Sequence, residues 1–191
     1  MKTLYLIRHG HSLHNEYFTR MGPKAFVLPE MKDSPLTDKG REQSRKLAET
    51  IHSDIELVLV SPLTRTLETA HNIFKDKNIP IKCLECLREY PMGLHTCNIR
   101  SEASKLQKTF PEIDFSDISG KDVFWKTNGE SLEGLNVRIE NMKEYIRNLP
   151  ETKIAVVSHN SFIGQLKDKH ISQLENNEEE LQHCYPYEYK L

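Results

Sequence analysis

The chain has 191 residues, a formal net charge of -2, 37% hydrophobic residues and 28% charged residues. This length predicts one domain, residues 1–191, with a single sizeable core, and the near-neutral charge argues against a nucleic-acid-binding protein. No apolar run reaches the length of a membrane span, and the N-terminal sequence MKTLYLIRHG does not resemble a signal peptide. We therefore expect a cytoplasmic protein that does not bind membranes.

Strand-like and helix-like apolar patterns alternate along the chain. Short apolar runs predict strands, whereas apolar residues spaced three or four apart predict helices. The expected strands are Thr3–Ile7, Leu57–Val60, the weaker Ile79–Cys86, Ile154–Val157 and an edge strand within His183–Leu191. The expected helices are one that follows Gly10, then Leu36–Ile51 capped by Thr37, Thr64–Phe74, Ser101–Phe110, Ser131–Leu149 and one that runs through Lys169.

Segments without a clear period are expected to form loops. These segments are Phe18–Ser34, Leu87–Ile99 and Pro111–Gly129. The first contains Gly22 and Pro29 and is long enough to suggest a functional role. The acidic run Glu175–Glu180 is interpreted as a solvated face or loop and is assigned no role.

The alternation of strands and helices is typical of an α/β domain with a largely parallel sheet. In such sheets, ligands bind beyond the carboxyl ends of the strands. Polar residues directly follow three of the expected strands: Arg8 with His9, Ser61 with Arg65 four positions later, and Ser158 with His159. We expect these three clusters to meet at one edge of the sheet.

Such a cluster has the chemistry of an anion site that contains a nucleophile. Arginine presents a rigid, charged fork that matches phosphate oxygens, and the N-terminal amides of the following helices add positive potential. A neutral histidine can accept a phosphoryl group through the lone pair on one ring nitrogen, and a second, charged histidine would balance the phosphate. Each residue alone is more often structural or solvated, so the joint placement favours the functional interpretation.

Five blocks of the sequence resemble, in the same order, the motifs of the histidine phosphatase superfamily, also called phosphoglycerate mutase-like. They are LIRHGHSLHN at Leu6–Asn15, DSPLTDKGREQ at Asp33–Gln43, SPLTRTLETA at Ser61–Ala70, LREYPMG at Leu87–Gly93 and AVVSHN at Ala155–Asn160. The resemblance implies a three-layer αβα sandwich with a mostly parallel central sheet. The short stretch between the third block and the helix at Ser131 predicts a small cap or none.

The resemblance also implies roles for individual residues. His9 matches the nucleophile that becomes phosphohistidine, and His159 matches the second histidine of the pocket. Arg8 and Arg65 match the two arginines that grip the phosphoryl oxygens. Glu89 matches the proton donor, and its task requires a carboxyl group that is protonated when the alkoxide leaves, hence one with a raised pKa.

Other positions match the family less closely. Asn15 matches a further phosphate contact, and Asn160 replaces a frequent Gly but keeps a backbone amide that can donate to substrate. His11 stands where many members carry Glu or Gln. Arg100, within the CNIRS stretch at Cys97–Ser101, resembles a position of one branch, and it either binds a second anionic group of the substrate or has a structural role.

We interpret the chain as a metal-independent phosphatase that hydrolyses phosphomonoesters through a phosphohistidine on His9. The alternatives are a phosphoglycerate mutase-type phosphotransferase and a catalytically silent binding module of the same fold. The short cap region favours hydrolysis, and the intact set of motif residues argues against a silent module. The expected substrate is a phosphorylated small molecule or a phosphopeptide, and no sequence pattern defines the oligomeric state.

Histidine and cysteine clusters could instead indicate a metal or redox site. His9, His11 and His14 do not share a face on a strand-to-turn segment and lack a carboxylate or thiol at the companion spacing, so we expect no metal and no cofactor. Cys83 and Cys86 form a single C-x-x-C without a second pair, and we expect buried or incidental thiols.

Overall fold

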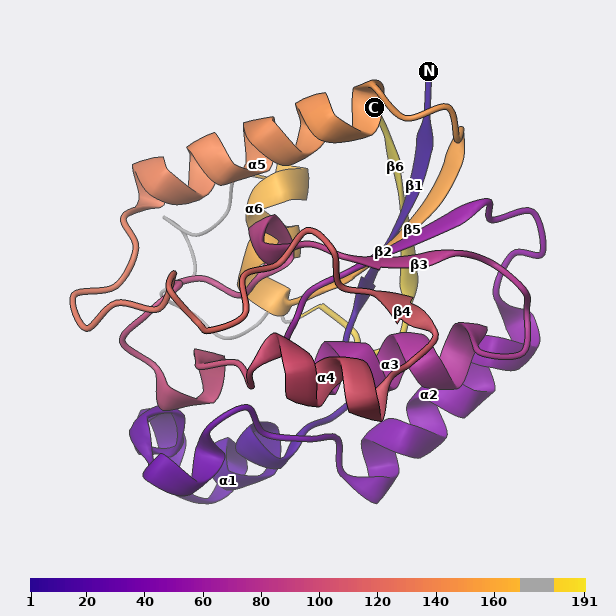
Figure 1. Ribbon diagram of the computed structural model, residues 1–191. Helices are drawn as coiled ribbons and strands as arrows, with labels where there is room; N and C mark the ends of the chain where they lie inside the picture. Colours follow the sequence, from indigo (N-terminus) through magenta and orange to yellow (C-terminus); the bar gives the residue numbers. More distant parts are fainter. Residues whose placement is uncertain (169–180) are drawn as a thin grey trace.

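The computed structural model describes residues 1–168 and 181–191, and a sheet with the strand order β4-β3-β2-β5-β1-β6 lies at its centre (Figure 1). Neighbouring strands run parallel except β6, which pairs antiparallel with β1 at the sheet edge. The strands are β1 (Thr3–Arg8), β2 (Leu57–Val60), β3 (Ile81–Cys83), β4 (Ile113–Asp114), β5 (Lys153–Ser158) and β6 (Pro186–Lys190). The expected mostly parallel sheet is confirmed.

Helices connect the strands and cover both faces of the sheet (Figure 1). They are α1 (Leu13–Met21), α2 (Asp38–Thr50), α3 (Thr64–Phe74), α4 (Ala103–Thr109), α5 (Leu132–Arg147) and α6 (Asn160–Asp168). Single 3-10 turns lie in the longer connections: η1 (Gly22–Val27), η2 (Pro29–Met31), η3 (Glu85–Leu87) and η4 (Thr96–Asn98). As expected, Thr37 caps α2, because its Oγ1 accepts the N–H of Gly40 at 3.3 Å.

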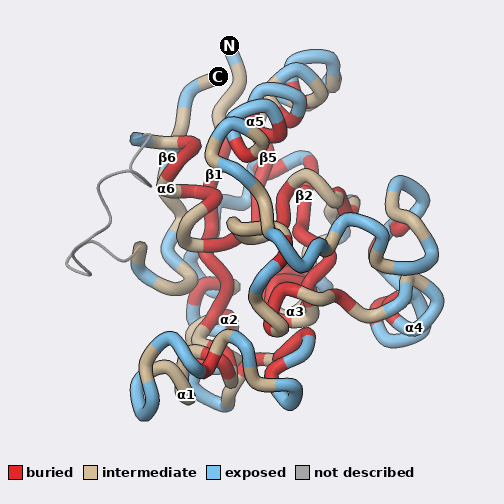
Figure 2. The backbone as a smooth tube through the Cα atoms, turned by 90° about the vertical axis from the view of Figure 1, so that its left-hand side faces the viewer, coloured by how far each residue is buried: buried red, intermediate tan, exposed pale blue. Residues whose placement is uncertain are grey.

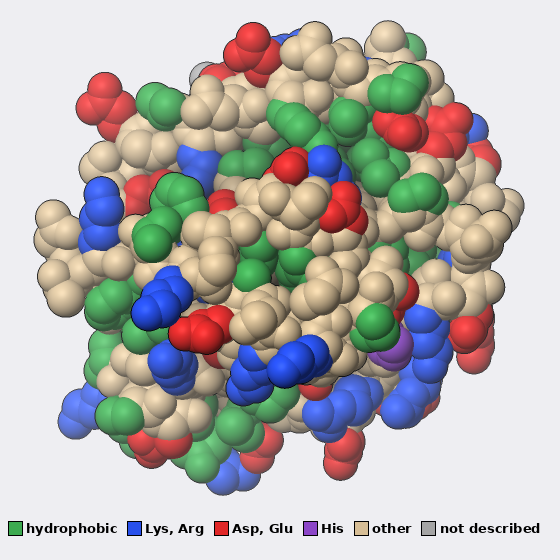
Figure 3. Space-filling view, viewed as in Figure 1, with side chains coloured by type: hydrophobic (Ala, Val, Ile, Leu, Met, Phe, Trp, Pro, Cys, Tyr) green, Lys and Arg blue, Asp and Glu red, His purple; other side chains and the backbone are tan. Residues whose placement is uncertain are grey.

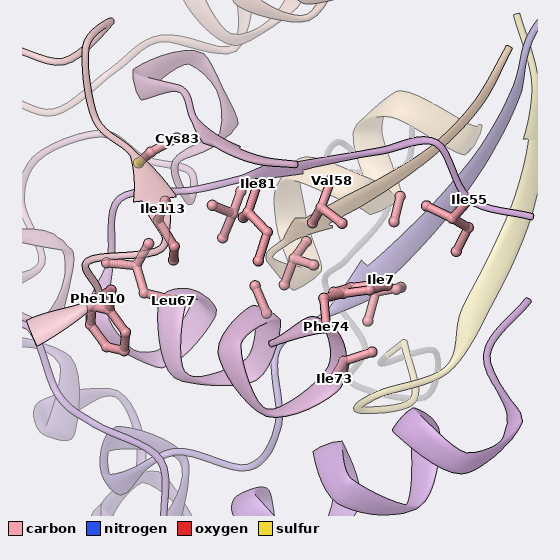
Figure 4. Packing of buried hydrophobic residues seen from close by; sticks show 14 of the residues in the cluster. Ile7, Ile55, Val58, Leu67, Ile73, Phe74, Ile81, Cys83, Phe110 and Ile113 are labelled. Atoms are coloured by element: carbon pink, nitrogen blue, oxygen red, sulfur yellow. The ribbon is translucent and has the colours of Figure 1, made fainter. Parts of the chain in front are cut away.

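Two apolar clusters hold the layers together, one on each face of the sheet. Successive residues of a strand point to opposite faces, so Tyr5 and Ile7 of β1 join one cluster while Leu4 and Leu6 join the other. The first cluster includes side chains of α2, α3 and α4 (Figure 4), and the second includes side chains of α5 and α6. The central strands β1, β2 and β5 are therefore buried on both faces (Figure 2).

The structure differs from the expected elements in several places. The expected strand Ile79–Cys86 is shortened to β3 (Ile81–Cys83), because the 3-10 turn η3 begins at Glu85. The segment Phe18–Ser34 is only partly loop, because α1 continues to Met21 and the 3-10 turns η1 and η2 follow. Gly22 ends α1 with φ of 66°, a left-handed conformation that favours glycine. Strand β4 was not expected, because two residues are too few to show an alternating pattern. The strand extends the sheet edge, and α4 packs on the first cluster, so this region adds to the sandwich.

A close backbone approach fixes the loop that follows β1. A methyl group on Gly40 would lie 2.1 Å from the carbonyl oxygen of His11, and a methyl group on Gly10 would lie 2.6 Å from the carbonyl oxygen of Gly40. The same His11 oxygen accepts hydrogen bonds from the N–H and the hydroxyl of Thr37. The first turn of α2 is thereby held against the loop, which can come this near only because both contact positions lack a side chain.

The described surface exposes both acidic and basic side chains. Acidic and basic side chains are interspersed on the face shown in Figure 3, in agreement with the net charge of -2. Within residues 1–168 and 181–191, no helix is long and apolar enough to cross a membrane. The acidic run Glu175–Glu180 and the expected helix end at Lys169 lie outside the described residues.

Candidate active site

The parallel pairing of β1 with β5 brings two histidines together at the carboxyl edge of the sheet. Arg8 lies opposite Ser158 in this pairing, and the N–H of His9 donates to the Ser158 carbonyl at 3.0 Å. The rings of His9 and His159 consequently lie 5.3 Å apart, centroid to centroid. Arg65 reaches the same edge from the first turn of α3, which follows β2. The three clusters expected from the sequence thus meet.

The hydrogen bond of His9 defines which of its nitrogens can act as a nucleophile. Nδ1 lies 2.7 Å from the carbonyl oxygen of Gly10, and because a carbonyl only accepts, Nδ1 carries the proton. Burial, together with the positive charge of Arg65, lowers the pKa of His9 well below its usual value. His9 is therefore neutral near pH 7, and its Nε2 carries a free lone pair.

The two arginines bring fixed positive charge to a buried place. Arg8 is 3% exposed and donates from Nη1 to the carbonyl of Leu181 at 2.7 Å. Arg65 is 1% exposed and donates to the carbonyl of Cys97 at 2.8 Å and to Oδ1 of Asn98 at 2.9 Å. Its Nε has no acceptor among the described residues. The Nε–H of Arg65 can therefore donate to an anionic ligand, and the fork of a guanidinium matches such a ligand.

His159 lies behind His9 and is fully buried. Its Nε2 is 2.7 Å from the hydroxyl of Ser61, whereas its Nδ1 has no partner within the described part of the chain. Burial and the charge of Arg65 lower the pKa of His159 well below its usual value. The second histidine is consequently neutral here, in contrast to the charged one that the sequence suggested, because it is buried and lies near the charge of Arg65.

Glu89 occupies the loop after η3 and has the raised pKa that a proton donor needs. Burial raises its pKa, and backbone amides that face the carboxylate oppose this effect only in part. Oε1 accepts the N–H groups of Tyr90 at 2.8 Å and Phe162 at 3.2 Å, while Oε2 receives only the Ser161 N–H at 3.4 Å. Oε2 is thus the oxygen that can carry and deliver a proton.

The two asparagines are fixed by their neighbours. Oδ1 of Asn15 accepts the N–H and the hydroxyl of Ser12, so its amide N–H₂ is the end left for a ligand, 3.4 Å from Nε2 of His14. Oδ1 of Asn160 accepts the N–H of Leu181 at 2.9 Å. Asn160, at the start of α6, therefore contacts Leu181, whose carbonyl also accepts the hydrogen bond from Arg8.

All of these residues except His159, which is buried beside His9, line one cavity of about 350 Å³. Its wall includes Arg8, His9, Asn15, Arg65, Glu89 and Asn160. A larger cavity of about 680 Å³ lies elsewhere and is lined by side chains of mixed charge, including Lys32, Asp33 and Glu68. Because the smaller cavity contains the neutral His9, two arginines and a carboxyl group with a raised pKa, it is the candidate active site.

Arg100 does not reach this cavity. Its side chain is fully buried, and its Nη2 lies 2.5 Å from Oε1 of Glu85 and also donates to the carbonyls of Ser119 and Lys121. These contacts tie η3 to the loop around Ser119. Of the two interpretations open from the sequence, substrate binding is not supported by this position, and Arg100 has a structural role.

His11 and the C-x-x-C cysteines also do not line this cavity. Nδ1 of His11 lies 2.9 Å from the hydroxyl of Thr37, and its N–H donates to Gln43, so the residue holds α2. Cys83 is buried and unpaired, and burial raises the pKa of Cys86 to about 11. In the described ranges, no group of three or more His, Cys, Asp or Glu side chains is arranged to hold a metal ion.

Two further histidines, which the sequence did not assign to the site, lie beside His9. His183, just before β6, places its Nδ1 2.5 Å from the His9 carbonyl, and burial lowers its pKa to about 3. His14 of α1 is buried on the cavity wall, 5.8 Å from the His9 ring. His14 lies in the first motif, so its position there was a usable signal. His183 is too far away in sequence for any spacing argument.

Comparison with known proteins agrees with this geometry. The family model of the histidine phosphatase superfamily (branch 1) matches residues 4–183. The chain belongs to the histidine phosphatase superfamily. The phosphoglycerate mutase-like protein 1 of Arabidopsis thaliana is 31% identical over 197 residues, which cover 85% of this chain and 69% of that protein. A Schizosaccharomyces pombe protein with the name "Probable phosphatase" is also 31% identical, covering 83% of this chain and 74% of its own length.

Solved structures share the fold of this histidine phosphatase superfamily member. The alpha-ribazole phosphatase of Shigella flexneri superposes with a TM-score of 0.57 at 27% identity, covering 88% of this chain and 79% of that chain. The phosphoserine phosphatase of Entamoeba histolytica, solved with 3-phosphoglyceric acid, superposes with a TM-score of 0.59 at 21% identity, covering 100% and 96%. The second similarity concerns the fold alone. Together these results show a phosphatase or mutase-like enzyme family.

Proposed function

We propose that the protein is a phosphatase that hydrolyses phosphomonoesters through a phosphohistidine on His9. The observation that carries this proposal is the neutral His9 ring, whose Nδ1 proton is held by the Gly10 carbonyl, so that Nε2 keeps its lone pair beside Arg8 and Arg65. A nucleophile next to two buried cations favours attack on a phosphoryl group and not on a neutral carbonyl centre.

The reaction has two steps. In the first, Nε2 of His9 forms a bond to phosphorus while the phosphorus–oxygen bond to the alcohol breaks, and Glu89 transfers its proton to the departing oxygen. The arginines stabilise the charge that develops on the transferred group. In the second, water attacks the phosphohistidine, Glu89 accepts a proton from that water, and the bond to Nε2 breaks. The products are the alcohol and inorganic phosphate, and Glu89 is protonated again.

Labelled substrate tests this assignment directly. We expect rapid mixing with a ³²P-labelled phosphomonoester to trap a protein-bound phosphate that is stable in base and labile in acid, as a phosphoramidate is. His9→Ala should show neither this adduct nor measurable turnover. An adduct that resists acid, or a His9→Ala variant that keeps a large share of the wild-type rate, would remove His9 from the nucleophile role.

The mutase alternative rests on the phosphoglycerate mutase-like name of several relatives. A mutase returns the phosphoryl group to a sugar acid, whereas a phosphatase releases it to water. The two activities are separated by measuring inorganic phosphate and the isomer ratio in one incubation with 3-phosphoglycerate. Free phosphate without isomerisation supports the proposed hydrolysis.

The cytoplasmic location expected from the sequence stays a prediction.

A further inference from the structure

One side of the active-site cavity is an aromatic wall, formed by His14, Phe18, Phe26 and His95. The rings of Phe18 and Phe26 are stacked, with centroids 5.1 Å apart and an interplanar angle of 12°. His95 packs on Phe26 at 5.0 Å, and His14 packs on it at 5.9 Å. Phe26 is thus the centre of the wall, which continues to the ring of His9, 5.8 Å from that of His14.

Hydrogen bonds from outside the cavity hold the wall in place. The indole N–H of Trp125 donates to the His95 carbonyl at 3.0 Å. Nδ1 of His14 lies 2.8 Å from the hydroxyl of Ser12 and 3.0 Å from that of Ser34. The wall combines α1, η1 and the residue before η4, which come from segments far apart in the sequence. These contacts hold the side chains of the wall in place before a ligand binds. Binding of a ligand there therefore costs little side-chain conformational entropy.

The aromatic wall carries no charge near neutral pH. Burial lowers the pKa of His14 and of His95, so both rings are neutral, and the two phenylalanines are apolar. Among the described residues that line the cavity, the permanent cations are Arg8 and Arg65, which lie at the phosphoryl end. A carboxylate or second phosphate on the leaving group would therefore lie against uncharged rings and Glu89. No further cation among the described lining residues would pair with this second negative charge, so its burial would be unfavourable.

The size of the cavity narrows the substrate further. Its volume of about 350 Å³ is near the lower end of the roughly 300–1,000 Å³ that is usual for small-ligand pockets. A cavity of this volume can hold a phosphoryl group at His9 together with a ring on the aromatic wall. A flat ring gains from offset or edge-to-face contacts with other rings, which a puckered ring of equal size does not make.

We infer that the preferred substrate is a phosphomonoester whose leaving group carries a single flat, uncharged ring lying against Phe26 and Phe18. This inference rests on the proposed phosphatase function and specifies its substrate class. Free aryl or arylmethyl phosphates and the phosphotyrosine side chain of a peptide share this chemistry. Phosphoglycerates and sugar bisphosphates do not.

The test compares benzyl phosphate with cyclohexylmethyl phosphate. Both esters release a primary alcohol of similar leaving-group strength, so the comparison isolates the flat ring from the chemistry of bond cleavage. We expect the wild-type kcat/KM to favour benzyl phosphate by about two- to tenfold, as aromatic pairing energies of about 0.5–1.5 kcal/mol imply. Phe26→Leu keeps an apolar side chain without a ring, and it should bring this ratio close to one, mainly through the KM of benzyl phosphate.

Phe124→Leu is the matched control. Phe124 is 44% exposed and lies outside the cavity, so this variant should keep the wild-type ratio. Equal kcat/KM for the two esters in the wild-type protein would overturn the inference while leaving the phosphatase function intact, and this result does not depend on the folding of any variant. A tenfold preference for 3-phosphoglycerate over benzyl phosphate would also overturn it. Complete inactivity toward every ester would instead refute the phosphatase function itself.

A second arm of the experiment distinguishes the sources of the ring. Phenyl phosphate and a phosphotyrosyl peptide are compared at equal concentration. Both should be turned over faster than a phosphoseryl peptide of the same sequence, because they place a ring on the aromatic wall and release a phenol, which leaves more readily than the serine alkoxide. A higher kcat/KM for phenyl phosphate supports a free metabolite, a higher value for the phosphotyrosyl peptide supports a protein substrate, and preference for the phosphoseryl peptide over both overturns the inference.

Discussion

The environment of Glu89 leads to a sharp prediction for Glu89→Gln. An amide in place of the carboxyl can keep both short contacts, since its oxygen can accept the N–H groups of Tyr90 and Phe162 as Oε1 does. The substituted N–H₂ takes the position of Oε2, where only the 3.4 Å contact with Ser161 is lost. Loss of one long hydrogen bond should cost about 0.5 kcal/mol of folding free energy or less, so the variant should fold.

The catalytic effect should depend on the leaving group. Glutamine cannot transfer a proton, so kcat/KM for an alkyl phosphate should fall about 10²–10⁴-fold, equivalent to about 3–5 kcal/mol in the barrier. The nitrophenolate of p-nitrophenyl phosphate leaves without a proton, and its rate should fall less than about tenfold on the same reasoning. Glu16→Gln removes a partly exposed carboxylate paired with Arg20 and should change neither rate.

The pH dependence gives a second measurement of the same assignment. Burial raises the pKa of Glu89, so the acid remains protonated to a higher pH than an exposed glutamate. The wild-type kcat/KM for an alkyl phosphate should fall as pH rises through this pKa, and the falling limb should vanish in Glu89→Gln. Equal losses on alkyl and aryl esters in a folded variant, with the falling limb retained, would refute the role of Glu89 as the acid.

Other residues of the site and the fold give further predictions. Arg65→Ala should lower kcat/KM by roughly 10²-fold or more. Arg65→Lys should restore only part of this kcat/KM, because the point charge of an ammonium group cannot replace the two parallel N–H donors of the guanidinium. Full recovery in Arg65→Lys would contradict bidentate binding of the phosphoryl group. His183→Ala removes the hydrogen bond to the His9 carbonyl and should lower kcat about two- to tenfold at constant KM in steady-state assays, whereas an unchanged kcat would mean that His183 does not position His9. In urea unfolding, Gly40→Ala should lower the free energy of unfolding by about 1–3 kcal/mol, because its methyl group meets a backbone carbonyl. Gly164→Ala lies in open space on α6 and should raise the free energy of unfolding by about 0.5–1 kcal/mol. Equal stability of the two variants would disprove the close approach.

The sequence predicted the central elements well because their patterns are local. Leu57–Val60 and Thr64–Phe74 agree residue for residue with β2 and α3, since a buried apolar run and a helical period each depend only on nearby residues. The meeting of His9, His159 and Arg65 also followed from local information. In a parallel sheet, the ends of the strands lie at one edge whatever the details of packing.

Other features were beyond local patterns. The aromatic wall depends on Phe26 and His95, which lie in segments expected to be loops, and their meeting is decided by how η1 packs on η4. Arg100 could not be assigned because its partner Glu85 is recognised only once the loop is folded. The neutral state of His159 likewise follows from burial beside Arg65, which no motif encodes.

The position of β1 in the sheet has a consequence for synthesis of the protein. Both neighbours of β1 lie far from it in sequence: β5 begins at Lys153 and β6 at Pro186. A growing polypeptide on the ribosome therefore carries Arg8 and His9 with no strand on either side of β1 until Lys153 and the residues after it have been made. The sheet closes only when His183 and Cys184 have emerged and bound the carbonyls of His9 and Arg8. Such long-range closure is slow compared with local folding, so the nascent chain acquires its anion site only after β5 and β6 have been made.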